Sequence, residues 1–202
     1  MIDDAYFDRF TTQKYRVRNP VQRLLIRRFV TRLHGLFERA EPVQSVLEVG
    51  VGEGFLSGFL SEKYPDKRFT GVDLRAEDLA ALREKFPRIA TAERNIYALG
   101  ELPGPFDLVI CAEVLEHVDE PERGLEQLLA QRPKQLILTV PHEPWFMLSN
   151  LARGKNLRRL GNDVEHVNHF TVRSFARLLR TRCVVEEVTT SYPWILARAR
   201  PR

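Results

Sequence analysis

Residues 46–54 read VLEVGVGEG, an apolar run that ends in three alternating glycines. In α/β proteins, a strand followed by such a glycine turn and then a helix cradles a ligand. The dinucleotide pattern G-x-G-x-x-G would need its third glycine at position 55, which is Phe55. The carboxylates of Glu48 and Glu53 flank the turn and would repel a pyrophosphate. The stretch therefore predicts a ligand-binding turn whose ligand is not a dinucleotide.

The composition is that of a globular chain long enough for one domain. Of the 202 residues, 44% are hydrophobic and 29% are charged, which excludes a disordered chain. The formal net charge of +4 is compatible with anionic ligands, RNA or a membrane surface, but we expect most arginines to form a solvated face. Two cysteines, Cys111 and Cys183, cannot supply a disulfide framework or a thiolate zinc site.

We find no signal for export or membrane insertion in the sequence. The N-terminal MIDDAYFDRF is acidic and lacks the apolar core of a signal peptide. Apolar runs stay well below the ~18 residues that a membrane span needs. We therefore expect a cytoplasmic protein.

A long amphipathic helix is predicted over residues 20–39. Asn19 is a favourable N-cap, and Pro20 suits the first helical position. Apolar residues then recur at helical spacing opposite several arginines. The helix either covers the core of the domain, which we favour, or lies on a membrane surface.

Strands and helices alternate after this helix, which predicts an α/β fold with a doubly wound, mostly parallel sheet. The segment 141–170 breaks the rhythm and is expected to be a lid over the substrate. The expected strands are 45–50, 68–73, 88–95, 106–111, 135–140, 184–191 and 194–200, and the expected helices are 54–64, 76–86, 121–131 and 170–182.

The strand ends carry residues suited to a nucleoside ligand, because ligands of open α/β sheets bind beyond the carboxyl ends of the strands. Asp73 could accept both ribose hydroxyls, Asn95 could read an adenine edge, and Glu48 suits a positively charged group. S-adenosylmethionine has these features and no phosphate, and its carboxylate could approach backbone N–H groups near Gly52 to Phe55. The expected cofactor-binding residues are Glu48, Gly50, Gly52, Asp73, Leu74, Asn95, Ile96 and Ala112.

The glycine turn resembles motif I of the class I S-adenosylmethionine-dependent methyltransferases. GVDLRAEDL is similar to the acidic second motif of that family, and FDLVICAEVLEHV to its fourth-strand segment. Asn95 departs from the aspartate that many members place there. The resemblance covers most of residues 45–140 and implies a Rossmann-like fold with seven strands, the last pair including an antiparallel member.

On this reading the chain is one methyltransferase domain. Its parts would be an N-terminal lid and helix (1–40), the cofactor-binding core (45–140), the substrate lid (141–170), and a closing helix and strands (171–202). The expected reaction is methyl transfer from S-adenosylmethionine to an oxygen or nitrogen atom of a small molecule.

Histidines gather after the fourth strand and around the lid. His117, His166 and His169 are the candidate catalytic residues, because histidine is the commonest general base near neutral pH. Each could instead serve local structure, His117 within the common EVLEHV segment and the other two by packing the lid.

A metal site is an alternative that we do not favour. Glu113, Glu116 and His117, with His166 or His169, would form an oxygen and nitrogen site. This set resembles that of the metal-dependent methyltransferases of small-RNA 3′ ends. RNA phosphates would then face the basic helix at 20–39 and basic residues of the lid. These lid residues are Arg153, Lys155, Arg158 and Arg159.

Other features remain open between two interpretations. Arg16 or Arg18 could reach the cofactor carboxylate or could be ordinary exposed arginines. A non-catalytic module with this fold would show a degenerate glycine turn, whereas this turn is intact. The apolar residues of the lid could contact an apolar part of the substrate or fill the core. They are Trp145, Phe146, Met147, Leu148 and Leu151.

Overall fold

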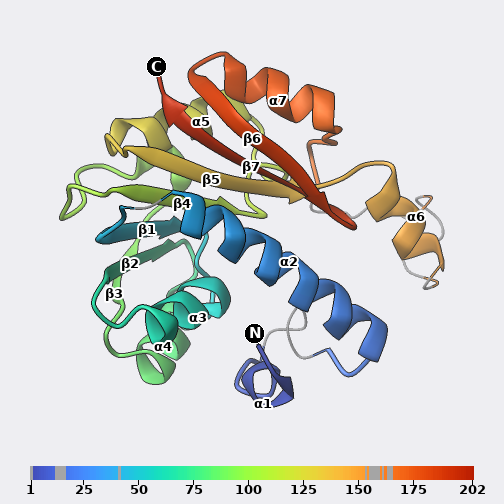
Figure 1. The fold of residues 1–202 in the computed structure, drawn as a ribbon, viewed down its shortest axis with the longest axis horizontal. Helices are drawn as coiled ribbons and strands as arrows, with labels where there is room; N and C mark the ends of the chain where they lie inside the picture. The colour runs from blue at the N-terminus through green and yellow to red at the C-terminus, as the bar shows by residue number, and fades with distance from the viewer. Residues whose placement is uncertain are drawn as a thin grey trace.

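The computed structural model describes residues 2–11, 17–40, 42–152, 154, 160, 162 and 166–202. Its centre is a seven-stranded sheet in the order β3-β2-β1-β4-β5-β7-β6, with helices on both faces (Figure 1). Its strands are β1 (Ser45–Val49), β2 (Arg68–Asp73), β3 (Ala90–Glu93), β4 (Leu108–Ala112), β5 (Gln135–Pro141), β6 (Cys183–Ser191) and β7 (Trp194–Pro201).

Strand directions confirm the predicted doubly wound sheet. β1 pairs in parallel with β2 on one side and with β4 on the other, and β3 and β5 extend the parallel part. β7 is antiparallel to both of its neighbours, β5 and β6, and it forms a hairpin with β6. The order reverses between β1 and β4, which is where an open α/β sheet binds its ligand.

The central strands are apolar because helices cover both of their faces. In β4, Leu108 and Ile110 belong to one core cluster, while Val109 and Cys111 belong to the other. This alternation, with every residue buried, explains why the strand reads as a continuous apolar run.

One face of the sheet carries α1 (Asp4–Phe7), α2 (Pro20–Arg39), α3 (Phe55–Lys63) and α4 (Ala76–Lys85). The side chain of Asn19 accepts hydrogen bonds from Val21 N–H and Gln22 N–H, as predicted for an N-cap. Helix α2 buries an apolar stripe that includes Phe29, Leu33 and Phe37, so it covers the core. Among the helices of the described residues, none combines the length and the apolar character that crossing a membrane requires.

Helix α1 was not predicted from the sequence. It has four residues, too few to show a periodicity, and it forms through tertiary contacts. The Tyr6 hydroxyl donates to Phe55 O at 2.7 Å, and Phe7 and Phe10 pack their rings on Phe55 at centroid distances of 5.6 and 4.9 Å. The N-terminal segment is therefore held on the first turn of α3.

The opposite face carries the short 3-10 helix η1 (Ile96–Ala98), α5 (Pro121–Ala130) and α7 (Val172–Arg180). Helix α6 (Trp145–Ala152) projects from the end of the sheet beyond β5 (Figure 1). It lies in the segment 141–170, where the sequence predicted a lid without regular structure. Strand β5 also runs on to Pro141, which was expected to stop it and which lies opposite Trp194 of β7.

Gly58 provides a test of how α3 packs on α4. A Cβ atom built there would lie 2.3 to 2.6 Å from three ring atoms of Phe86, whereas at Gly35 of α2 the nearest atom is the flexible end of Arg39 at 3.4 Å. We expect Gly58→Ala to lower the free energy of unfolding by about 1–3 kcal/mol. Gly35→Ala should raise it by up to about 1 kcal/mol. Urea denaturation measures both, and stabilisation by both changes would contradict the packing of Phe86.

Candidate functional site

The glycine turn between β1 and α3 adopts a conformation that glycine alone takes readily. Gly50, Gly52 and Gly54 have φ angles of 80°, 52° and 85°. The N–H groups of Gly50 and Val51 both donate to Val72 O, at 2.8 and 3.0 Å, and so fix the turn on β2. A Cβ at Gly50 would lie 2.2 Å from Val114 Cγ2, so the loop after β4 packs directly on the turn.

Asp73 at the end of β2 holds the same turn from the side. Its Oδ2 accepts from Gly52 N–H at 2.8 Å and its Oδ1 from Arg75 N–H at 3.0 Å. Leu74 follows with 59% of its surface exposed. A Cβ at Gly52 would meet no atom of the described residues within 4 Å, so the turn keeps open space on its outer side.

The two glutamates of the glycine turn, Glu48 and Glu53, are both buried. The sequence suggested that their carboxylates face a ligand, whereas each is bonded to groups of the protein. Glu48 is 2% exposed, and its Oε2 accepts from the backbone N–H of Ser57 at 2.9 Å and from the Ser57 hydroxyl. A carboxylate there also favours the N-terminus of α3.

Glu53 points away from the turn. It is buried and accepts from Lys85 Nζ at 2.5 Å, from Thr11 N–H at 3.0 Å and from the Thr11 hydroxyl at 2.7 Å. Burial alone raises the pKa of Glu53, but the hydrogen bonds from Lys85 and Thr11 outweigh it and hold that pKa at about 2. The side chain thereby latches the N-terminal segment to the turn.

Several backbone donors of the turn are also engaged within the chain. Gly52 N–H donates to Asp73, and Gly54 N–H donates to Val51 O at 2.9 Å. Of the N–H groups near Gly52 to Phe55 that a ligand carboxylate was expected to approach, these two thus already have an acceptor within the chain.

The remaining expected cofactor residues follow β3 and end β4. The exposed Asn95 uses its side-chain oxygen to cap η1, accepting from Tyr97 N–H at 2.9 Å. Ile96 and Ala112 are 6% and 8% exposed and form part of the two core clusters. The ends of β1, β2 and β4 are neighbours in the sheet, and β3 lies beside β2.

The loop after β4 is strained at its first residue. Glu113 has a φ angle of 59°, which residues other than glycine rarely adopt. Such strained backbone angles are common at functional sites. Its N–H donates to Thr139 O at 3.1 Å, and its Oε1 accepts from the Thr139 hydroxyl at 3.0 Å. These two bonds fix the loop to β5.

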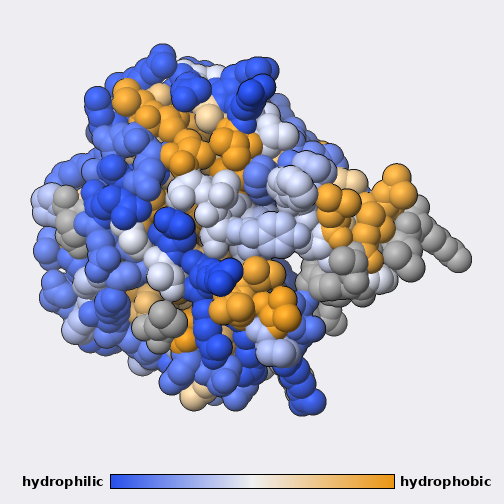
Figure 2. Space-filling view, turned by 45° about the vertical axis from the view of Figure 1, so that its right-hand side comes forward, coloured by the Kyte–Doolittle hydropathy of each residue, from blue (hydrophilic) through white to orange (hydrophobic). Residues whose placement is uncertain are grey.

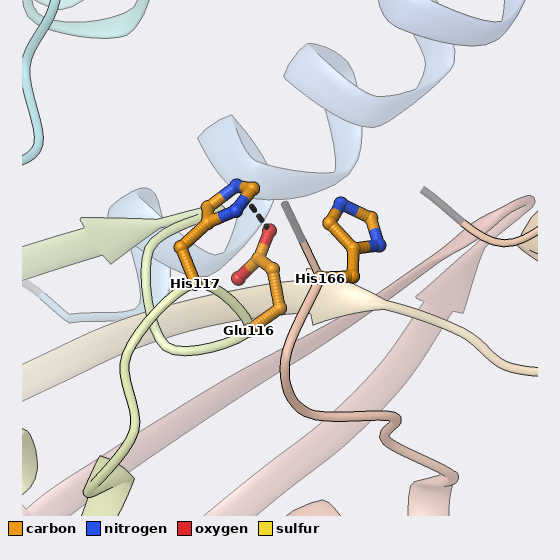
Figure 3. Close-up of side chains that lie close together, drawn as sticks. All are labelled: Glu116, His117 and His166. Carbon is orange, nitrogen blue, oxygen red and sulfur yellow. Dashed lines mark ion pairs between the residues drawn. The ribbon is translucent and has the colours of Figure 1, made fainter. Parts of the chain in front are cut away.

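Glu116 and His117 of that loop form a carboxylate–histidine cluster with His166 from the segment before α7 (Figure 3). One ligand atom from each lies within 4.8 Å of the others, and Glu116 Oε1 is 3.7 Å from His117 Nε2. Glu116 is 1% exposed, His166 is half-buried and His117 is exposed.

Asn168 brings the distant His166 to this loop. Its Nδ2 donates to Val118 O at 2.5 Å and to Leu115 O at 3.3 Å. The N–H groups of Val167 and Asn168 both donate to Glu116 O, at 2.9 and 3.0 Å. The expected candidates His117 and His166 therefore meet, with ring centroids 5.0 Å apart.

His169 lies apart from the cluster, beside Glu143. Its Nδ1 is 3.9 Å from Glu143 Oε1, and Glu143 Oε2 accepts from Met147 N–H in the first turn of α6 at 3.1 Å. Burial raises the pKa of Glu143, against the opposing effects of the Met147 N–H and His169. Burial also lowers the pKa of the preceding His142.

Helix α6 presents apolar side chains outward, and Figure 2 shows hydrophobic residues gathered over this projecting part of the molecule. Trp145 and Leu148 are exposed, and Phe146, Met147 and Leu151 are half-buried, so the reading that these residues fill the core is wrong. The hairpin of β6 and β7 borders this side. His142 N–H donates to Pro193 O at 2.8 Å, and the hydroxyls of Ser149 and Tyr192 lie 2.6 Å apart.

Some sequence candidates lie outside the described residues: Arg16, Arg153, Lys155, Arg158 and Arg159. Other residues that shape the site were missed. Thr139 carried a signal, as a polar residue within an apolar strand. Thr11 and Asn168 carried none, because their roles depend on contacts with residues 42 and about 50 positions away.

A model of a methyltransferase domain family matches residues 20–182. The mitochondrial ubiquinone biosynthesis O-methyltransferase of Saccharomyces cerevisiae is 30% identical over 127 residues, 59% of this chain and 41% of that protein. The malonyl-[acyl-carrier protein] O-methyltransferase of Chlorobium phaeovibrioides is 35% identical over 124 residues, 58% of this chain and 45% of that protein. The matches thus span less than half the length of these two relatives.

The fold is similar to the crystal structure of magnesium protoporphyrin IX methyltransferase from Synechocystis with bound S-adenosylhomocysteine. The TM-score is 0.72 at 19% identity, over 98% of this chain and 95% of that one. Together with the family match, this confirms the resemblance found in the sequence. The chain belongs to the class I S-adenosylmethionine-dependent methyltransferases.

The latch formed by Glu53 gives a pH-dependent prediction. Its pKa falls from an ordinary 4.5 to about 2 on folding, so its contribution is full above pH 4.5 and is lost as pH falls toward 2. We expect Glu53→Gln to cost about 3 kcal/mol of unfolding free energy at neutral pH. The difference from the wild type should shrink below pH 4.5.

Urea denaturation over a pH series measures this difference. Glu101→Gln in an exposed loop is the matched control and should change stability by less than about 0.5 kcal/mol at every pH. A difference for Glu53→Gln that stays constant down to acidic pH would show that the Glu53 charge is not its source.

Proposed function

We propose that this protein transfers the methyl group of S-adenosylmethionine to an oxygen atom of a small molecule. The observation that carries the proposal is the glycine turn, held by Val72 and Asp73 and open on its outer side at Gly52. It stands at the point where the strand order reverses, in a chain of the methyltransferase family.

The donor would lie across the carboxyl ends of β1, β2 and β4. Asp73 accepts one backbone hydrogen bond at each oxygen and keeps a lone pair on each for the ribose hydroxyls. The exposed Leu74 would cover one side of the adenine ring. The side-chain oxygen of Asn95 would accept a hydrogen bond from the adenine amino group. Gly52 and Ala112 would admit the donor because larger side chains there would occupy its space, whereas Gly50 would keep the turn in contact with Val114 beside the donor. Glu48 and Ile96 would support this surface from within.

An oxygen acceptor is favoured over nitrogen by the relatives, two of which are named O-methyltransferases. The exposed Trp145 and Leu148 of α6 support an apolar part in the acceptor. The alternative of an RNA acceptor stays a prediction; its basic lid residues lie outside the described part of the chain. A single domain and a cytoplasmic location stay predictions.

The protein must also accept or direct the proton that the acceptor hydroxyl loses. His117, His166 and His169 remain the candidates, and they fall into two groups. The first two belong to the carboxylate–histidine cluster, and His169 lies beside Glu143, which could orient its ring.

Calorimetric titration with S-adenosylhomocysteine and, separately, with NAD tests the cofactor. We expect one-to-one binding of the former alone. Asp73→Ala should weaken it by about tenfold to a hundredfold, because hydrogen bonds to a charged group are lost. Asp66 is exposed and lies two residues before the first residue of β2, at the opposite end of that strand from Asp73. Asp66→Ala is the matched control and should bind S-adenosylhomocysteine as the wild type does. Binding of NAD, or equal effects of the two variants, would contradict the assignment.

Release of S-adenosylhomocysteine across a panel of hydroxylated and aminated acceptors tests the reaction. Once an acceptor is found, we expect alanine at the proton-accepting histidine to lower kcat by about 10²- to 10⁴-fold. Titration with S-adenosylhomocysteine would show whether the same variant still binds the donor product. Full activity in all three of His117→Ala, His166→Ala and His169→Ala would exclude a histidine base.

A further inference from the structure

Glu143, two residues after the end of β5, has a buried carboxylate oxygen with an unused capacity to accept a hydrogen bond. The residue is 6% exposed. Its Oε2 accepts from Met147 N–H at 3.1 Å, whereas no donor of the described residues bonds to its Oε1. Leaving a buried acceptor without a donor costs about 1–3 kcal/mol, so such an atom in a folded protein calls for an explanation.

The ring of His169 is within reach of this oxygen. His169 Nδ1 lies 3.9 Å from Glu143 Oε1, and 42% of the His169 side chain is exposed. A hydrogen bond needs the two atoms about 1 Å closer, which a rotation of the exposed ring supplies. Hydrogen bonds between catalytic groups are often this long before the substrate binds.

Backbone hydrogen bonds on both sides of His169 hold it beside Glu143. In front of it, the N–H of Asn168 donates to Glu116 O at 3.0 Å. Behind it, Phe170 O accepts from the N–H of Glu143 at 2.8 Å. The two side chains can therefore meet without a movement of the backbone.

We propose that His169 is the general base of the methyl transfer and that Glu143 positions its ring. This inference rests on the proposed function and deepens it. The buried carboxylate accepts the hydrogen bond of Nδ1–H, which holds the imidazole in the tautomer whose Nε2 carries a lone pair. That lone pair is free for the hydroxyl of the acceptor.

The other two candidate histidines are arranged less favourably for this task. Glu116 Oε1 lies 3.7 Å from Nε2 of His117, so the same kind of pairing there leaves only Nδ1, the ring nitrogen nearer to the backbone. The ring of His166 lies 5.0 Å from that of His117, and a proton taken up by one ring disfavours a charge on the other.

The surroundings of the pair define the acceptor as a hydroxyl on an apolar body. Glu143 is bonded to the first turn of α6, the helix that exposes Trp145 and Leu148. Strand β5, which leads to Glu143, lies beside β4, whose following loop packs on the glycine turn. The apolar body of a phenol or an alcohol would then lie against α6, with its hydroxyl toward His169.

The atoms and electrons of the step balance. Nε2 of His169 takes the hydroxyl proton while a lone pair of the acceptor oxygen forms the C–O bond with the methyl carbon. The C–S bond breaks and the sulfur keeps the bonding pair, so the sulfonium becomes the thioether of S-adenosylhomocysteine. The Glu143 carboxylate stabilises the imidazolium, which afterwards releases its proton to water.

The tautomer of His169 is measured by ¹⁵N NMR of the whole protein, labelled at histidine, at about pH 8, where an ordinary histidine is neutral. His169→Ala assigns the signals by removing them. We expect the Nδ1–H tautomer in the wild type and the Nε2–H tautomer in Glu143→Gln. In that variant the amide oxygen still accepts from Met147 N–H, so the amide NH₂ faces the ring and donates to Nδ1.

Glu38→Gln is the matched control, because it changes a second glutamate–histidine pair. Glu38 Oε1 lies 3.6 Å from His34 Nε2 on α2, and Glu38 is exposed. This variant should leave the tautomer of His169 unchanged.

Kinetics with an acceptor found in the panel give the second readout. Glu143→Gln should lower kcat by about 10²- to 10⁴-fold with little change in KM, and Glu38→Gln should change neither. Among the alanine variants of His117, His166 and His169, the last should show the largest fall in kcat.

The outcomes separate this inference from the proposed function. The Nε2–H tautomer in the wild type, or the same tautomer in the wild type and Glu143→Gln, would overturn the pair and leave the proposed function standing. A larger fall in kcat at His117 or His166 would overturn the choice of base. Failure of the wild type to bind S-adenosylhomocysteine would overturn the proposed function and the role of His169 with it, whatever its tautomer.

Discussion

The contact between the glycine turn and the loop after β4 determines the arrangement of everything around it. Gly50 leaves no room for a side chain because Val114 occupies that space. The same short loop then supplies Glu116 and His117, and through Asn168 it receives His166. One close approach between the loops after β1 and β4 therefore positions both the turn proposed to hold the donor and the cluster that contains two of the candidate proton acceptors.

The acids of the first motif show how a charged sequence builds a stable turn. Glu48 receives two hydrogen bonds from Ser57 at the start of α3, and Glu53 is paired with Lys85 and Thr11. Both carboxylates are buried, so both need these partners. Asp73 completes the pattern by holding Gly52. The turn is thus preorganised by three acids before a ligand arrives.

Local signals in the sequence predicted most of the fold. Asn19-Pro20 marked the start of α2, and RFTGVD matched β2 residue for residue. Helix α1 was missed because its four residues fold only against Phe55. The direction of a side chain was harder to predict: Glu53 lies one residue from two glycines of the turn yet points to α4. His166 and His169 looked equivalent in sequence, but the bonds made by Val167 and Asn168 give them different surroundings.

The hairpin of β6 and β7 has a consequence for how this chain can diversify. Its turn contacts His142 before α6 through Pro193 and Ser149 within α6 through Tyr192, so the last strands border the same side as Trp145 and Leu148. The turn held by β2 lies in the first half of the chain, and this bordering surface in the second. The surface beside α6 can therefore change shape without altering the bonds from Val72 and Asp73 that fix the glycine turn.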